Sequence, residues 1–99
     1  MYVSGTGPVG ADTEEAGKQT LQALSLIEQA LANAGAARED VVRTRMYLTL
    51  VSDWPSVGAA HKEFFGETCP AATMVVVAGL LHPSWRVEIE ADAVVFSSK

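Results

Sequence analysis

The sequence predicts an α+β domain in which two helices cover one face of a mixed β-sheet. Apolar residues alternate in the segments we expect to be strands, recur at helical spacing in two others, and give the order β-α-β-α-β-β. We treat residues 1–99 as a single domain, because no linker, repeat or low-complexity tract divides them. The second face of the sheet must then meet water or another subunit.

Turn residues mark the ends of the first strand and the first helix. MYVSGTG at residues 1–7 alternates as a strand does, and a loop rich in glycine and proline follows it. Asp12 or Thr13 is a candidate N-cap for the helix after this loop. Leucine and isoleucine then recur every three or four residues as far as Gly35, which we expect to end the helix.

The second strand and second helix follow the same plan. VVRTRMYLTL at residues 41–50 alternates, and Asp53 is the expected N-cap of a helix that ends before Gly66. The residues expected on one face of the strand are Val42, Thr44, Met46, Leu48 and Leu50. The residues expected on the apolar stripe of the helix are Trp54, Val57, His61, Phe64 and Phe65.

Two more strands complete the predicted sheet. TMVVVAGL at residues 73–80 is almost entirely apolar, so we expect it to be buried on both faces. RVEIEADAVVF at residues 86–96 alternates, but its polar face carries Glu88, Glu90 and Asp92 in succession. Such acids lie about 7 Å apart along a strand and repel one another modestly.

This row of acids has two interpretations. In the first, the carboxylates face water or pair with Arg43 and Arg45 from another strand. In the second, one carboxylate lines a cleft, where burial raises its pKa and suits it for proton transfer. Periodicity alone favours the first interpretation.

Composition and charge argue against several classes of protein. The net charge is -5 and the seven basic residues are scattered, which argues against a nucleic-acid binder. No apolar run is long enough to span a membrane, and no signal peptide is visible. The single cysteine, Cys69, cannot form an internal disulfide, so we expect a cytoplasmic location. Without a metal-ligand motif, we expect neither a metal nor a cofactor.

Six stretches of the chain resemble the Rid family, also called the YjgF-type or L-PSP family, of reactive-intermediate deaminases. They are SG at 4–5, QTLQAL at 19–24, VVRTRMYL at 41–48, DWPSVGAAHKEFFG at 53–66, PAATMVVV at 70–77 and VEIEADAVV at 87–95. The resemblance covers nearly the whole chain in the right order. It implies a chorismate-mutase-like subunit, a homotrimer with a central barrel, and small-molecule clefts between subunits.

The resemblance also implies site residues. The family's serine falls on Ser4, next to Gly5, and the glutamate that positions the hydrolytic water falls on Glu88. Active deaminases read Pro-Ala-Arg before a serine or threonine, whereas this chain has Ala72 in place of the arginine, followed by Thr73. The alternative role of the Thr73 hydroxyl is a hydrogen bond to nearby backbone groups.

Three further positions depart from the family pattern. A cysteine of the family becomes Met74, an asparagine of the second helix becomes Gly58, and a tyrosine becomes His61. For His61, a packed, hydrogen-bonded core histidine is an equal alternative. The expected substrate-binding residues are Ser4, Gly5, Gly58, His61, Ala72, Thr73 and Met74, with Glu88 as the catalytic residue. Family members usually carry a β-hairpin before the first strand, which we expect this chain to lack.

Ala72 lowers the activity expected of this chain. An arginine would hold a substrate carboxylate bidentately, and losing it costs about 2–4 kcal/mol unless Arg43, Arg45 or Arg86 replaces it. We therefore expect weak or absent activity on simple 2-imino acids. The leading function is binding of a small metabolite between subunits, with hydrolysis of an imine or enamine. The alternative is a non-catalytic metabolite-binding or regulatory module, and an endoribonuclease ranks last.

Overall fold

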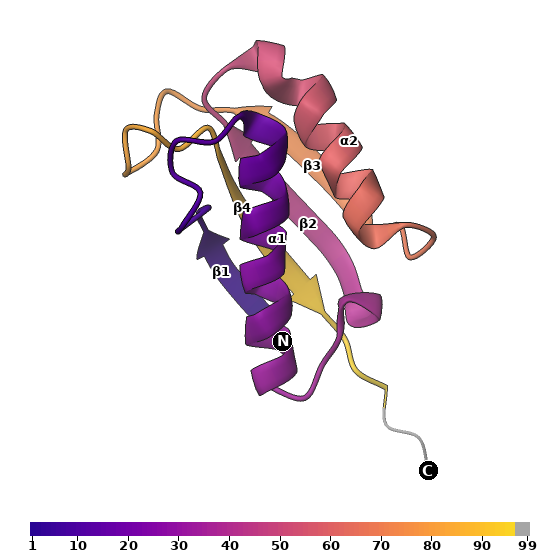
Figure 1. The fold of residues 1–99 in the computed structure, drawn as a ribbon. Coiled ribbons are helices and arrows are strands. Elements are labelled where there is room, and N and C mark those ends of the chain that lie inside the picture. The colour runs from indigo at the N-terminus through magenta and orange to yellow at the C-terminus, as the bar shows by residue number, and fades with distance from the viewer. Residues whose placement is uncertain (97–99) are drawn as a thin grey trace.

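Two helices lie on one face of a four-stranded sheet in the computed structural model, which describes residues 1–96 (Figure 1). The strands are β1 (Tyr2–Thr6), β2 (Val41–Leu48), β3 (Ala71–Val76) and β4 (Val87–Ala93). The helices are α1 (Ala16–Asn33) and α2 (Trp54–Phe65), with short 3-10 turns η1 (Arg38–Asp40) and η2 (Val51–Asp53). The predicted α+β class and element order are confirmed.

The sheet is mixed, with the order β1-β4-β2-β3. β4 pairs antiparallel with both β1 and β2, whereas β2 and β3 run parallel. A parallel pair needs a crossover, and α2 supplies it between β2 and β3. β1 and β3 are therefore the two edges of the sheet, as Figure 1 shows.

The hydrophobic core lies between the helices and the side of the sheet that faces them. Burial alternates along β4, where every second residue is buried. The largest apolar side chains that are fully buried are Leu24, Ile27, Leu31, Leu48, Val57, Val87 and Ile89. Each such side chain stabilises the fold by about 1.5–3 kcal/mol relative to leaving it in water.

α1 begins later than the predicted N-caps would place it. Glu15 is the N-cap, and its Oε1 accepts a hydrogen bond from the backbone N–H of Lys18 at 2.7 Å. Asp12 instead accepts a hydrogen bond from the indole N–H of Trp85 at 2.8 Å. The predicted end is confirmed, because Gly35 follows the helix with a φ of 85°, a conformation that favours glycine.

A β-bulge in β2 changes which valine faces the core. Val41 pairs with Ala93 and Arg43 pairs with Asp92, so Val42 has no partner between them. As a result Val41 is buried, whereas Val42 is 46% exposed. The prediction that Val42 faces the core was wrong, because strict alternation cannot anticipate an inserted residue.

β3 also differs from its prediction. We expected residues 73–80 to be buried on both faces, but the strand is mostly exposed, with Val75 at 42% and Val76 at 50%. The reason is topological, because the strand order places β3 at an edge with β2 as its one neighbour. Apolar side chains of β3 therefore remain partly exposed when one chain is considered alone.

Asp53 stands at the N-cap position of α2, but its side chain makes no capping hydrogen bond. It accepts two hydrogen bonds from the Arg86 guanidinium instead, at 2.9 and 2.6 Å. This ion pair ties the start of α2 to the segment before β4. Trp54, which we expected on the buried stripe, is 60% exposed.

The buried amide of Gln19 joins two loops to α1. Its Nε2 donates to the carbonyls of Asp12, Glu14 and Ser84, and its Oε1 accepts from the backbone N–H of Arg86. The loop before α1 and the turn before β4 are thereby held against one side chain. The sequence carries no signal for this role beyond a glutamine within the apolar helix.

Candidate functional site

Two of the three acids of β4 are bound by side chains of β2. Arg45 lies 3.2 Å from Asp92 and 3.7 Å from Glu90, and the hydrogen bond to Asp92 raises the pKa of Arg45. Tyr47 donates its hydroxyl to Glu90 at 2.7 Å, which raises the pKa of Tyr47. The paired, half-solvated interpretation of the acid row is therefore confirmed for Glu90 and Asp92.

Glu88 differs from these two acids. Within residues 1–96, no hydrogen bond or ion pair to its carboxylate is found. The carboxylate lies over the bulge in β1, where a Cβ added to Gly5 would overlap Glu88 Oε2. The absence of a side chain at Gly5 thus permits the close approach of Glu88 to the backbone of β1.

The register of β1 explains this geometry. Val3 pairs with Ala91 and Thr6 pairs with Ile89, so Ser4 and Gly5 together occupy the space of one residue. The hydroxyl of Thr6 donates to the Ser4 carbonyl at 2.9 Å and helps to hold the bulge. Gly5 and Glu88 are therefore brought together near the β1 edge, and Ser4 precedes Gly5 within the bulge.

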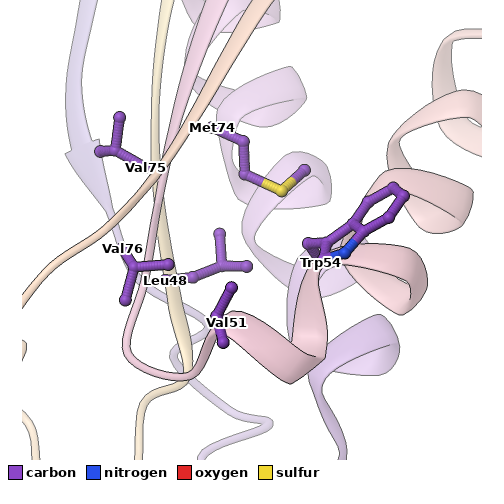
Figure 2. A pocket seen from close by; sticks show the side chains of 6 residues that line it. All are labelled: Leu48, Val51, Trp54, Met74, Val75 and Val76. Atoms are coloured by element: carbon purple, nitrogen blue, oxygen red, sulfur yellow. The ribbon is translucent and has the colours of Figure 1, made fainter.

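A second group of predicted residues meets at the β3 edge. Met74 pairs in register with Met46 of the core, which directs Met74 to the helix-covered side. A Cβ on Gly58 of α2 would lie 4.0 Å from Met74 Cε. Figure 2 shows Met74 reaching from β3 toward the indole of Trp54 at the start of α2. Met74 and Trp54 line an open pocket of about 350 Å³.

Ala72 and Thr73 turn toward opposite faces of the sheet. Ala72 pairs with the buried Thr44 and so belongs to the helix-covered side, as Met74 does. Thr73 pairs with Arg45, so it shares the face that carries the paired acids. Glu88 lies on this second face, opposite Tyr47.

His61 points into the core. Its side chain is 9% exposed, its Nε2 lies 2.8 Å from Thr44 Oγ1, and its ring packs on Phe65 with the centroids 4.8 Å apart. Burial lowers the pKa of His61, so the neutral imidazole is favoured. The structure thus has the packed, hydrogen-bonded histidine, and the expected contact of His61 with a ligand has no geometric support.

None of the three arginines considered as replacements for the missing clamp lines the pocket beside Met74. Arg86 is bound to Asp53, and the hydrogen bond to that carboxylate raises the pKa of Arg86. Arg43 and Arg45 pair in register with Asp92 and Glu90, so they lie on the opposite face of the sheet.

Trp85 anchors the loop after β1. Its ring covers Gly7 so closely that a Cβ there would overlap it. The indole N–H bonds to Asp12, and the ring of His82 stacks on Trp85 at 5.2 Å between centroids. The loop after β1 and the turn before β4 are thus packed together, and the position of Gly7 is the sequence signal that could have indicated it.

Over the described part of the chain, residues 1–96, no group of three or more His, Cys, Asp or Glu side chains could hold a metal ion. Among these residues, neither α1 nor α2 is sufficiently long and apolar to cross a membrane.

The sheet order and the placement of both helices on one face define a chorismate-mutase-like α+β subunit. The family described as Endoribonuclease L-PSP matches residues 1–95. The crystal structure of Rv2704 from Mycobacterium tuberculosis, a member of the YjgF/YER057c/UK114 family, has a TM-score of 0.88 and 47% identity, covering 95% of this chain and 77% of that one. The chain therefore belongs to the Rid family, as its motifs predicted.

Two relatives have names that state an activity. The 3-aminoacrylate deaminase RutC of Acinetobacter baylyi is 33% identical over 98 residues, which are 94% of this chain and 77% of that protein. The 2-iminobutanoate/2-iminopropanoate deaminase of Salmonella typhimurium is 35% identical over 101 residues, which are 95% of this chain and 78% of that protein. The chain spans 57% of the length of a third relative, an uncharacterized Streptomyces coelicolor protein 37% identical to it.

Proposed function

We propose that this protein hydrolyses an imine or enamine to a carbonyl compound and ammonia, with Glu88 as the group that moves the proton. The observation that carries the proposal is the Glu88 carboxylate lying against Gly5, without a neutralising partner among residues 1–96. A carboxylate left free in this way can accept a proton from water. The two relatives named as deaminases support the reaction class.

The proposed reaction consumes one water and no oxidant. An enamine first tautomerises to the imine, its N–H proton being replaced by a proton on the β-carbon. Water then attacks the carbon of the C=N bond, its proton passes to Glu88, and Glu88 returns that proton to the nitrogen, which gives a neutral carbinolamine with a new C–O bond. The C–N bond of the resulting carbinolamine then breaks, the hydroxyl proton is transferred through Glu88, and ammonia leaves as the C=O bond forms. Ser4 and Thr73 would orient the substrate or the water, and backbone N–H groups near residues 72–74 would stabilise developing charge.

We further propose that the cleft is completed by a second copy of the chain, in a homotrimer. Glu88 and Gly5 lie near one edge of the sheet, whereas Ala72 and Met74 lie on the other edge and the other face. One small ligand cannot contact both groups within a chain. The apolar edge strand β3 supports the same conclusion, because it lacks a partner along its outer side.

We place this activity in the cytoplasm. Cys69, the single cysteine of the sequence, is an exposed free thiol, which a reducing compartment suits. The substrate would be a small metabolite, and no metal or cofactor enters the proposed reaction.

A non-catalytic metabolite-binding or regulatory module is the alternative proposal. The observation that favours it is Ala72, which stands where the resemblance assigns the family's arginine and which leaves the pocket beside Met74 without a cation. An endoribonuclease ranks third despite the family description. Arg38, Arg45 and Arg86 are each engaged by carboxylates and do not form a basic stripe.

Ammonia release from imines that an oxidase generates in place tests the proposal. General acid–base catalysis contributes about 10²- to 10⁴-fold, so Glu88→Gln should lower turnover by at least about 100-fold. Glu67→Gln, at an exposed turn position, is the matched control and should retain full activity. A Glu88→Gln variant as active as wild type would refute the role of Glu88. Ligand binding without turnover in the wild-type protein would instead favour the binding module.

A further inference from the structure

The pocket beside Met74 is lined by apolar side chains alone. Its volume is about 350 Å³, and its lining residues are Leu48, Val51, Trp54, Met74, Val75 and Val76 (Figure 2). Val51 is 67% exposed and Trp54 60%, although single exposed apolar residues are usually scattered over a surface. Exposed apolar side chains that gather around a hollow instead mark a binding site.

Within one chain, no cationic side chain lines the pocket to receive a carboxylate. A carboxylate that enters an apolar site loses its water and must gain a cation or several hydrogen-bond donors in return. Arg86 is committed to Asp53, and Arg43 lies on the other face of the sheet. Ala72, on the same side of β3 as Met74, adds only a methyl group.

The size and walls of the pocket suit one aromatic ring or a short branched alkyl group. Small-molecule sites range from about 300 to 1,000 Å³, so 350 Å³ lies at the small end of that range. The indole of Trp54 provides a flat wall, and the unbranched side chain of Met74 adapts to the shape of its neighbour. Gly58 leaves Met74 room to move, because its Cβ position would be 4.0 Å from Met74 Cε.

We propose that this pocket holds an uncharged apolar substituent of the substrate, so that the protein acts on aryl or branched-alkyl imines with no carboxylate on the reacting carbon. This inference rests on the proposed function, and it names the substrate class of that site. The pocket lies on the Ala72–Met74 side of β3, beside the backbone that would face the reacting group. The competing occupant is a side chain from a second copy of the chain.

Binding of acetophenone and of benzoylformate to the full-length protein tests the proposal by titration calorimetry. The two probes differ only in having a methyl group or a carboxylate on the carbonyl carbon. We expect wild type to bind acetophenone at least about tenfold more tightly than benzoylformate. One mismatched group in an apolar pocket changes affinity by about 10- to 200-fold. We expect Ala72→Arg to reverse the preference by adding a cation beside the pocket.

Two equally exposed valines provide a matched pair of variants. Val76→Gln places an amide in the pocket and should weaken acetophenone binding about tenfold. Val42→Gln makes the same change at the far end of β2, where the exposed fraction is 46%, against 50% for Val76. This control variant should not weaken acetophenone binding. The mass of each variant shows whether assembly has changed.

Each outcome decides the proposal. Equal or tighter binding of benzoylformate by wild type would overturn it, as would equal effects of Val76→Gln and Val42→Gln. Failure of wild type to bind acetophenone would also overturn it. Turnover is measured separately, with imines made from benzylamine and from phenylglycine. Binding of acetophenone without turnover would reject the proposed function alone, whereas turnover that prefers the phenylglycine imine would reject this inference alone.

Discussion

The three acids of β4 show how neighbours decide the role of a residue type. Arg45 lies within 3.7 Å of both Glu90 and Asp92, and Tyr47 also donates to Glu90, so these two acids are engaged within the sheet. Glu88 is opposite Tyr47 in register, but the Tyr47 hydroxyl is directed to Glu90. Among residues 1–96, the Glu88 carboxylate therefore has no such partner, a difference that periodicity alone could not reveal.

Gly5→Ala should abolish the proposed activity while leaving the fold intact. The added Cβ would overlap the Glu88 carboxylate and displace it, and we expect turnover to fall by about 100-fold. The comparison is with Gly79→Ala, because a Cβ at Gly79 meets nothing within 4 Å. Turnover and the melting temperature are measured for both variants. Full activity of Gly5→Ala would show that the position of Glu88 does not matter.

His61 makes the stability of the protein depend on pH. Burial lowers the pKa of folded His61 below its usual 6.5, so the unfolded chain binds this proton more readily. Stability is therefore fully present above about pH 6.5 and is lost as the pH falls below it. Urea unfolding at pH 7.5 and pH 5.5 should show this loss, and His61→Gln should reduce it. The control variant His82→Gln changes a half-exposed ring and should leave this loss of stability unchanged.

At the scale of secondary-structure elements, the start of α2 depends on one ion pair. Asp53→Ala removes both hydrogen bonds to Arg86 from a site where the carboxylate side chain is 8% exposed. We expect a loss of about 1–3 kcal/mol in the free energy of unfolding. Glu28→Ala breaks a similar pair with Arg38, but that carboxylate is 36% exposed, and we expect about 0.2–1 kcal/mol. Equal losses in urea titrations would contradict the role given to burial.

The predictions for elements succeeded where a simple period governed the chain. Alternation correctly predicted the buried positions of β4, and the spacing of leucines predicted the buried face of α1. They failed at the bulge of β2, where one inserted residue places Val41, and not Val42, on the core face. They failed also at β3, because an apolar strand has the same composition at an edge as in the centre of a sheet.

For the whole molecule, the separation of the two residue groups argues for assembly. β2 separates β4, which carries Glu88, from β3, which carries Met74. The two side chains also lie on opposite faces, so within a chain the sheet itself stands between them. A site that uses both must join two chains.

Val75→Lys should prevent the proposed trimer from forming. Val75 is 42% exposed on the edge strand β3, and lysine at an edge opposes pairing between chains. We expect wild type to sediment at three times the 10.5 kDa of one chain and the variant to sediment as a monomer without turnover. Ala32→Lys makes the same change in charge on the exposed side of α1 and should remain trimeric. A wild-type monomer would overturn the proposed assembly.

The sequence by itself determined the α+β class, the order of the elements, the family and the candidate site residues. It could do so because apolar periods and turn residues are local properties, and because the family motifs lie in order along the chain. The same local information identified Glu88 as the candidate acid and Ala72 as the departure that lowers the expected activity on 2-imino acids.

Only the tertiary structure decided which acid remains without a partner, where the arginines are used and which way His61 points. These depend on contacts between residues far apart in sequence: Arg45 with Asp92, Arg86 with Asp53, and Thr44 with His61. No local pattern encodes such contacts, because they are set by strand register and by the packing of α2 on the sheet. The apolar pocket between β3 and α2 arises in the same way, from elements that meet only in the fold.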